Sequence, residues 1–291
     1  MPDVALLEVP VRGSTMAYRE AGAGRPVLLL HGNPTSSFLW RHVLRRAAAG
    51  EPGAGRWIAP DLIGMGSSGK PDLAYTFADH ALFVDGFIEA LGLTDLVLVG
   101  HDWGVALAVD RARRHPVVRG LALMEGHLRP LPGWEAFDEG GRQLFQQLRA
   151  PGTGERMVLQ ENFFLDTLLL AALLRPLGPD ELAVYRAPYP DPAARRPLLQ
   201  WARAIPVAGE PDDVTRRLTA GAQHLATTSV PTLLLHGDPG VLVTADTVTW
   251  WRRHVPALTV ADVGGPAGHF LPEDRPEAVA DALLAWVQDL A

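Results

Sequence analysis

The chain has 291 residues, 47% of them hydrophobic, and a formal net charge of −7 at pH 7. A negative charge balance without a run of basic residues argues against a nucleic-acid partner. The chain contains no cysteine, which excludes disulfides, thiolate nucleophiles and cysteine-based metal sites. A chain of this length suits one large α/β domain, or an α/β core that carries an insertion.

The sequence shows no targeting or membrane-spanning segment. Its first residues lack the basic and apolar stretches of a signal peptide. The longest uninterrupted apolar run, Leu168 to Leu174, is far shorter than the roughly 20 residues that span a bilayer. We therefore expect a cytoplasmic protein without a membrane partner, present as a monomer or a small homo-oligomer.

Short apolar runs bounded by glycine, proline and aspartate predict the strands. Two alternating runs, near Leu6 to Pro10 and Thr15 to Arg19, predict a leading hairpin at the edge of a sheet. Six further runs predict buried strands: Val27–Leu30, Trp57–Ala59, Leu96–Val99, Leu121–Met124, Thr232–Leu235 and Leu258–Val260. Helical periods between several of them include Phe77–Leu91, Val105–Arg114 and Pro276–Leu290. This alternation predicts an α/β fold with a mostly parallel, doubly wound sheet flanked by helices.

The interval from Gly126 to Val230 breaks this alternation, because it lacks a convincing strand. It contains helical patterns instead: Arg142–Leu148, Met157–Leu174, Pro179–Tyr185 and Pro197–Arg203. A structureless loop of such length is uncommon inside a compact domain. We therefore predict an inserted helical cap over residues 128–213, between two parts of the core at residues 1–127 and 214–291. Such a cap would cover the sheet edge where α/β proteins bind their ligands.

Gly100-His101-Asp102-Trp103-Gly104 follows the predicted strand Leu96–Val99 and precedes a helical pattern. This is the context of a G-x-S-x-G nucleophile elbow, with Asp102 in place of the serine. A carboxylate with an ordinary pKa near ~3.9 is ionised at neutral pH and needs no base before it attacks. Such a nucleophile suits displacement at a saturated carbon, which leaves an alkyl ester on the protein.

Hydrolysis of that ester needs a base, and His269 is the best candidate. It lies in the glycine-bearing stretch Gly264-Gly265-Pro266-Ala267-Gly268-His269-Phe270, after the last predicted strand. A late histidine on such a loop is where the chain order nucleophile, acid, histidine places the base. The competing interpretation, a loop histidine that caps the last helix, fits this position poorly.

The acid that orients the histidine is less plain. In hydrolases with such an elbow it usually ends a G-x-x-D after the strand that corresponds to Thr232–Leu235, and here Gly240 holds that place. Asp238 lies two residues too early. Glu125 directly follows the predicted strand Leu121–Met124, and a carboxylate that ends an apolar strand is costly unless it has a partner. We favour Glu125 and keep Asp238 as the alternative.

The loop His31-Gly32-Asn33-Pro34 follows the first buried strand. Such a loop normally supplies one oxyanion-hole N–H, and the residue after the nucleophile supplies the second. The side chains of Asn33 and Trp103 add an amide and an indole N–H, both neutral donors. Two neutral donors beside a carboxylate can hold a departing anion such as a halide. The alternative is that Trp103 packs under the cap and Asn33 caps a turn.

Several motifs closely resemble those of haloalkane dehalogenases, which have the α/β-hydrolase fold with a helical cap. They are the stretches 31–41, 61–68, 100–104, 124–125, 175–177, 185–188, 205–209 and 269–274. The resemblance covers essentially the whole chain, cap included. It is to the subfamily whose catalytic acid is a glutamate after the sixth strand, which agrees with the independent interpretation of Glu125.

The resemblance implies hydrolytic dehalogenation without a cofactor or a metal. A small halogenated aliphatic substrate and water would give an alcohol, a halide ion and a proton. Asp102 would displace the halide, Asn33 and Trp103 would bind it, and His269, oriented by Glu125, would activate water. The implied lining of an apolar substrate pocket is Phe137, Phe145, Phe164, Leu168, Val207, Leu242 and Phe270. Ordinary core packing is the alternative for each of them.

Two features leave other interpretations open. His127, two positions after Glu125, departs from the family pattern and either bonds Glu125 or faces solvent. An epoxide hydrolase resembles this chain in its Asp nucleophile but needs cap tyrosines to protonate the epoxide, and only Tyr185 and Tyr189 fall in the predicted cap. A luciferase of the coelenterazine type shares the motifs. A non-catalytic ligand-binding protein on the same fold would be free to lose the elbow, acid or histidine, and none is lost here.

Overall fold

The computed structural model describes residues 4–51 and 55–290, and it places eight strands of these residues in one sheet. The strand order is β1-β2-β4-β3-β5-β6-β7-β8. The strands are β1 (Leu6–Val11), β2 (Ser14–Ala21), β3 (Pro26–Leu30), β4 (Arg56–Pro60), β5 (Leu96–His101), β6 (Val118–Met124), β7 (Thr232–His236) and β8 (Leu258–Asp262). β2 is antiparallel to β1 and β4, whereas β3 to β8 run parallel. The predicted leading hairpin and mostly parallel sheet are confirmed.

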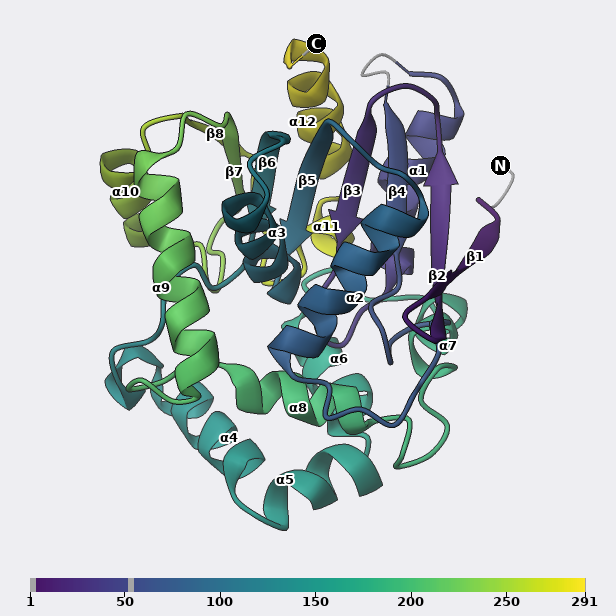
Figure 1. The fold of residues 1–291 in the computed structure, drawn as a ribbon. Helices are drawn as coiled ribbons and strands as arrows, with labels where there is room; N and C mark the ends of the chain where they lie inside the picture. The colour runs from purple at the N-terminus through teal and green to yellow at the C-terminus, as the bar shows by residue number, and fades with distance from the viewer. Residues whose placement is uncertain (1–3, 52–54, 291) are drawn as a thin grey trace.

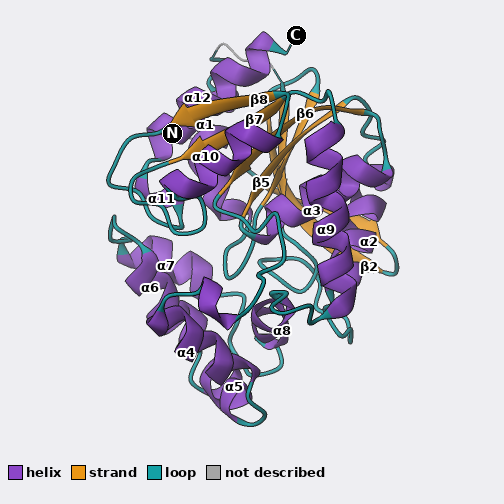
Figure 2. Cartoon of the chain, turned by 90° about the vertical axis from the view of Figure 1, so that its left-hand side faces the viewer, coloured by secondary structure: helices purple, strands orange, loops and turns teal. Residues whose placement is uncertain are grey.

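Helices cover both faces of the sheet (Figures 1 and 2). The face that packs against α1 (Arg41–Ala48) and α12 (Pro276–Asp289) has its own apolar cluster. The opposite face packs against α2 (Phe77–Ala90), α3 (Trp103–Arg114), α9 (Asp212–Thr227) and α10 (Ala245–His254). Successive residues of β3 alternate between the two clusters, since neighbouring side chains of a strand point to opposite faces. Both faces are buried, so the strands are continuous apolar runs rather than alternating ones.

The start of α2 follows from the local sequence. Thr76 accepts a hydrogen bond from the backbone N–H of Asp79, and the Asp79 carboxylate accepts one from the N–H of Thr76. This capping box satisfies two backbone donors that the first turn of a helix leaves without partners. The helix begins at Phe77, as its apolar periodicity predicts.

The region between β6 and β7, all of it described, contains no strand and forms a separate helical layer. Its helices are α4 (Glu139–Arg149), α5 (Thr153–Glu155), α6 (Leu169–Ala172), α7 (Pro179–Arg186) and α8 (Arg196–Ala204), with a 3-10 turn (Trp134–Ala136), two π-helical turns (Arg156–Gln160 and Phe164–Leu168) and then α9. Figures 1 and 2 show α4 to α8 beyond the carboxyl ends of the parallel strands, where a cap is predicted. Further short helices lie outside this layer: a 3-10 turn (Ser37–Trp40) and α11 (Leu271–Asp274).

The expected helix over Met157–Leu174 is wrong in detail. Asn162, with φ 53°, adopts the left-handed conformation that commonly ends a helix, and the segment is broken into π-helical turns and the short α6. The chain enters and leaves the cap side by side, because the N–H of Leu131 donates to Pro206 and the N–H of Ala208 donates to Leu131. The cap boundaries at 128 and 213 stay a prediction; the second falls in the first turn of α9.

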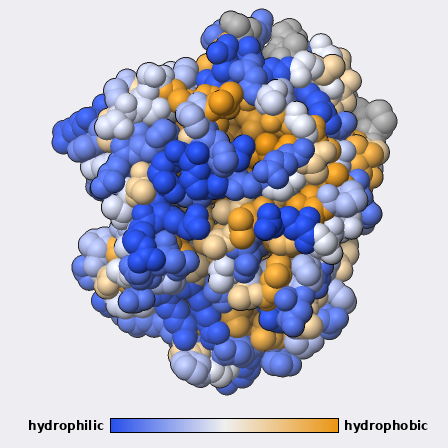
Figure 3. Space-filling view, in the orientation of Figure 1, coloured by the Kyte–Doolittle hydropathy of each residue, from blue (hydrophilic) through white to orange (hydrophobic). Residues whose placement is uncertain are grey.

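Few of the large apolar side chains described are exposed on the surface, as expected when most of them lie in the core. Within the described residues, every helix is too short or too polar to cross a membrane. On the face drawn in Figure 3, hydrophilic side chains cover most of the left side, and the apolar areas are interrupted by polar ones. The large apolar side chains are mainly in the two clusters that flank the sheet.

Candidate active site

Asp102 occupies a strained turn between β5 and α3. Its backbone has φ 54° and ψ −123°, a conformation that residues other than glycine rarely adopt. The glycines around it permit close packing: a Cβ on Gly104 would lie 2.0 Å from the carbonyl oxygen of Leu30. A Cβ on Gly32 would lie 2.0 Å from Oδ1 of Asp102, so the loop after β3 approaches the carboxylate directly. The sequence motif therefore builds a nucleophile elbow, as predicted.

The carboxylate of Asp102 has one partner for each oxygen. The backbone N–H of Asn33 donates to Oδ1 at 2.8 Å, and Nε2 of His269 lies 3.3 Å from Oδ2. Burial raises the pKa of Asp102, but the hydrogen bond and charge of His269, with the Asn33 N–H, outweigh it and hold the pKa below its usual value. The carboxylate is therefore ionised at neutral pH.

Glu125 lies behind His269. Nδ1 of His269 is 3.5 Å from Oε2 of Glu125, an ion-pair contact that is longer than a well-formed hydrogen bond. The fully buried Glu125 carboxylate also accepts backbone N–H groups from Val241, Leu242 and Val243. Burial raises its pKa, but His269 and these N–H groups lower it further than burial raises it. Such bonds to an anion are the compensation that a buried carboxylate needs.

The structure brings Glu125, and not Asp238, to His269. Asp238 is exposed, in the loop after β7. The usual acid position is held by Gly240, and a Cβ there would lie 3.1 Å from Oε1 of Glu125. The glutamate therefore reaches, from the end of β6, the point that an acid at position 240 would occupy.

The two carboxylates control the protonation of His269. Burial lowers its pKa, but the close contacts and negative charges of Asp102 and Glu125 outweigh burial and raise the pKa to about 9. Two neighbouring histidines behave differently. Burial lowers the pKa of His101 and of His127 to about 4, so both are neutral at pH 7. The half-buried His127 makes no hydrogen bond to a described residue, so it does not bond Glu125.

The loop that carries His269 is tied to the cap by residues whose role was not predicted. Asp274 accepts the N–H of Gly268 at 2.9 Å through one oxygen, and the N–H groups of Leu174 and Arg175 at 2.8 and 3.0 Å through the other. Its neighbour Glu273 is fully buried. Glu273 is held by three donors, Arg41 (2.6 Å), Arg175 (2.7 Å) and Tyr185 (2.5 Å). The motif 269–274 marks this stretch in the sequence, but its partners come from distant segments.

Asn33 and Trp103 each keep one side-chain N–H hydrogen free to bind a ligand. Nδ2 of Asn33 donates one hydrogen to the carbonyl of Leu198 at 3.1 Å, which leaves the second hydrogen of the NH₂ group. The indole of Trp103 stacks on Trp201, with ring centroids 4.6 Å apart. Its N–H has no acceptor among the described residues and is not among the fully buried unpaired atoms.

Of the seven predicted pocket residues, six belong to the apolar cluster of Trp103 or pack against it: Phe137, Phe145, Phe164, Leu168, Val207 and Phe270. Leu242 instead contacts Glu125 through its N–H. Their role as a pocket lining stays a prediction. The hydroxyl of Tyr185 donates to Glu273, so it is not free to protonate an epoxide, and the ring of Tyr189 lies beside Lys70.

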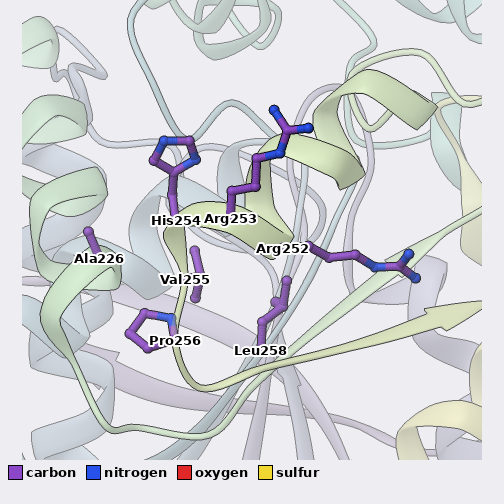
Figure 4. A pocket seen from close by; sticks show the side chains of 7 residues that line it. All are labelled: Ala226, Arg252, Arg253, His254, Val255, Pro256 and Leu258. Carbon is purple, nitrogen blue, oxygen red and sulfur yellow. The ribbon is translucent and has the colours of Figure 1, made fainter.

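Two hollows lie away from this constellation. One, of about 450 Å³, lies beside the connections to the cap, between Arg129–Pro132 and α9. The other, of about 290 Å³, lies near Leu258 at the amino end of β8, the edge of the sheet opposite Asp102. Figure 4 shows that its Arg252 and Arg253 guanidinium groups point apart, so they do not converge on an anion. Neither hollow brings a nucleophile and a base together.

Known proteins match the chain along almost its whole length. A family model described as the alpha/beta hydrolase family matches residues 27–282. A haloalkane dehalogenase from Mesorhizobium japonicum is 42% identical, with 97% of this chain and 91% of that protein covered. One from Sphingobium indicum is 43% identical, with 97% and 95% covered. The crystal structure of haloalkane dehalogenase DbeA from Bradyrhizobium elkani matches with a TM-score of 0.94 at 43% identity, and 99% of each chain is covered.

These matches include the cap as well as the core. The predicted fold and reaction class are therefore confirmed: the substrates are a halogenated compound and water, and halide is a product. The chain belongs to the haloalkane dehalogenases of the α/β-hydrolase family, the hydrolases that act on carbon–halogen bonds.

Proposed function

We propose that Asp102 is the nucleophile, His269 the base, Glu125 the acid that orients the base, and Asn33 and Trp103 the halide-binding pair. The observation that carries this proposal is the placement of the Asp102 carboxylate between the Asn33 N–H at 2.8 Å and His269 Nε2 at 3.3 Å. The proposed substrates are small halogenated aliphatic compounds.

In the first step, Oδ2 of Asp102 attacks the carbon that bears the halogen. The carbon–halogen bond breaks and the halide leaves with the electron pair, so that an alkyl ester forms on Asp102. The free N–H groups of Asn33 and Trp103 stabilise the negative charge that develops on the halogen. Both are neutral, so neither forms an ion pair with the nucleophile.

In the second step, His269 takes a proton from water, and the resulting hydroxide adds to the ester carbonyl carbon. Charge then develops on Oδ1, which the Asn33 N–H already contacts. The bond between this carbon and the alkyl oxygen breaks, the alkoxide takes the proton held by His269, and the alcohol leaves. The new carboxyl group of Asp102 then releases its own proton. Asp102 is restored as a carboxylate, and the net products are the alcohol, the halide and one proton.

The electrostatics of the site suit this order of steps. In the free enzyme the pKa of His269 is raised to about 9 by two carboxylates, against the effect of burial, so the imidazole is protonated at neutral pH. Esterification removes the charge of Asp102, and the pKa of His269 falls because only Glu125 then favours the imidazolium. The histidine thus loses its proton when its work as a base begins.

The test is halide release by the wild-type protein from 1-chloro-, 1-bromo- and 1-iodoalkanes, with styrene oxide as a control substrate. We expect halide from the alkyl halides and no diol from the epoxide. The matched variant Asp102→Ala is expected to release no halide, because it lacks the nucleophile. Diol from styrene oxide without halide release would replace the proposal with epoxide hydrolysis.

The remaining parts of the proposal concern the setting of the enzyme. We propose a cytoplasmic monomer or small homo-oligomer without nucleic-acid or membrane partners, and a cap over residues 128–213. Light scattering on the purified protein measures its mass in solution, and cell fractionation tests the location. A mass beyond that of a small oligomer, or recovery with membranes, would contradict these expectations.

A further inference from the structure

Helix α8 of the cap contacts both proposed halide donors within one turn. The carbonyl of Leu198 accepts the Asn33 amide at 3.1 Å. Three residues later, Trp201 stacks on Trp103 with an interplanar angle of 23°. Leu198 and Trp201 are both fully buried. One turn of a cap helix therefore sets the position of two side chains whose backbones belong to the core.

Trp201 is itself held in a socket made by the core. His80 of α2 stacks on it with ring centroids 4.2 Å apart, and no ring contact joins His80 to Trp103 among the described aromatic pairs. Trp201 therefore lies between these two rings. Its indole N–H donates to Sδ of Met65 at 3.3 Å, and Phe77 meets both tryptophans edge-on.

This socket fixes the plane of the Trp201 ring. A ring stacked on both faces and hydrogen-bonded at its edge has little freedom to tilt. Burial, with the charge of His31, lowers the pKa of His80 to about 3, so its ring is neutral and stacks without a formal charge in the core. Because Trp103 lies against this fixed surface, the direction of its own N–H is fixed as well.

We propose that Trp201 is a positioning residue for carbon–halogen bond cleavage: from the cap, it holds the indole of Trp103 so that the N–H points at the departing halide. This inference rests on the proposed role of Trp103. Trp201 does not touch the halide itself, because its own N–H is used by Met65. It acts on the displacement step and not on ester hydrolysis, since its ring contacts are with His80, Phe77 and Trp103 rather than with His269 or Glu125.

The displacement step is isolated in a His269→Ala background, where each protein releases one halide and stops. We expect Trp201→Leu to slow bromide release from 1-bromobutane by roughly tenfold, the worth of one stacked aromatic pair. Trp201→Phe, which keeps a ring in the stack, is expected to restore most of the rate. Leu148→Ala opens a cavity in α4, which packs against α8, but it leaves the ring stack and both donors in place, so it is expected to leave the rate nearly unchanged.

Three further measurements decide between positioning and general loosening. In proteins that retain His269, decay of the ester after rapid mixing, followed by intact mass, should be unaffected by Trp201→Leu. In a Trp103→Leu background, Trp201→Leu should have no further effect on displacement, because its route of action is gone. The bromide concentration that inhibits turnover by half should rise together with the loss of displacement rate.

Specific results would overturn the inference. Displacement at the wild-type rate in folded Trp201→Leu protein would do so. Equal losses of displacement rate in Trp201→Leu and Leu148→Ala would also do so. So would an effect of Trp201→Leu that is as large in the Trp103→Leu background as it is when Trp103 is present. If Trp103→Leu itself left displacement unchanged, the proposed function of Trp103 would fail first. If Trp103→Leu slowed displacement and Trp201→Leu did not, the positioning role alone would fail.

Discussion

The two sides of the active site are supported by different parts of the molecule. On the base side, His269 and Glu125 follow core strands, and the carboxylate is held by backbone N–H groups of the core. On the proposed halide side, Asn33 and Trp103 also start from the core, but their side chains are held by cap helix α8. The two chemical steps should therefore be separable: hydrolysis depends mainly on the core, and displacement depends on the seating of the cap.

The largest effect is expected from His269→Ala. This variant should release about one halide per protein and then stop, because displacement needs no base but hydrolysis does. The amount of halide released per protein measures the single displacement, and the added mass of the trapped ester measures the block in hydrolysis. His254→Ala, at the opposite edge of the sheet, is the matched control and should turn over normally. Continued turnover without His269 would take the base role away from it.

Glu125→Gln removes the charge behind His269 and keeps the shape of the side chain. We expect ester hydrolysis to slow by roughly 10²–10⁴-fold, the range for loss of acid–base support, while displacement changes little. Its amide also faces three backbone donors, so the melting temperature should fall. Asp238→Asn is the control: if it were the damaging change, the acid would be Asp238.

Trp103→Leu tests the halide side by itself. If its N–H stabilises the leaving anion, displacement should slow by roughly 10²–10³-fold, or about 3–4 kcal/mol, by analogy with loss of one oxyanion-hole donor. Ester hydrolysis should keep its rate. Rapid-quench measurements of both steps make the comparison, and an unchanged displacement rate would leave Trp103 a packing residue only.

The smallest effect is expected at Asp274, where the cap does touch the base side. Asp274→Asn leaves an amide N–H₂ where a carboxylate oxygen accepted an N–H, so the tie between Gly268 and the cap weakens. Loss of one such bond, ~1 kcal/mol, should slow hydrolysis by roughly fivefold. The same ester-decay assay detects it. A larger loss in displacement than in hydrolysis would show that the two sides are not separable.

The core was predictable from sequence because its physics is local. Strands buried on both faces appear as short apolar runs, and the pattern of Asp102 between Gly100 and Gly104 predicts the elbow. The cap was predictable only as a helical region. Its interruption at Asn162 depends on one backbone conformation within a continuous apolar pattern, which periodicity does not reveal.

The supports of the site were the least predictable part. Glu125 could be inferred because a charge at the end of an apolar strand requires a partner. The carbonyl of Leu198 carries no signal, since every residue has one, and the stack of Trp201 on Trp103 joins segments far apart in the chain. Asp274 and Glu273 likewise gain their meaning only from cap residues that fold back onto them.

The glycine at position 240 decides whether the acid could act on His269 from the loop after β7 instead of from the end of β6. It lies beside Glu125 in the loop after β7, and its φ of +66° is one that aspartate tolerates better than most residues. A Cβ there would also lie 2.6 Å from the carbonyl oxygen of Val243, so a side chain at this position requires the loop to shift. An acid at position 240 would therefore serve His269 only if this loop moved, and two carboxylates in contact would then compete for one proton. The double substitution Glu125→Gln and Gly240→Asp tests this arrangement. Recovered ester hydrolysis would show that the acid can act on His269 from either strand end.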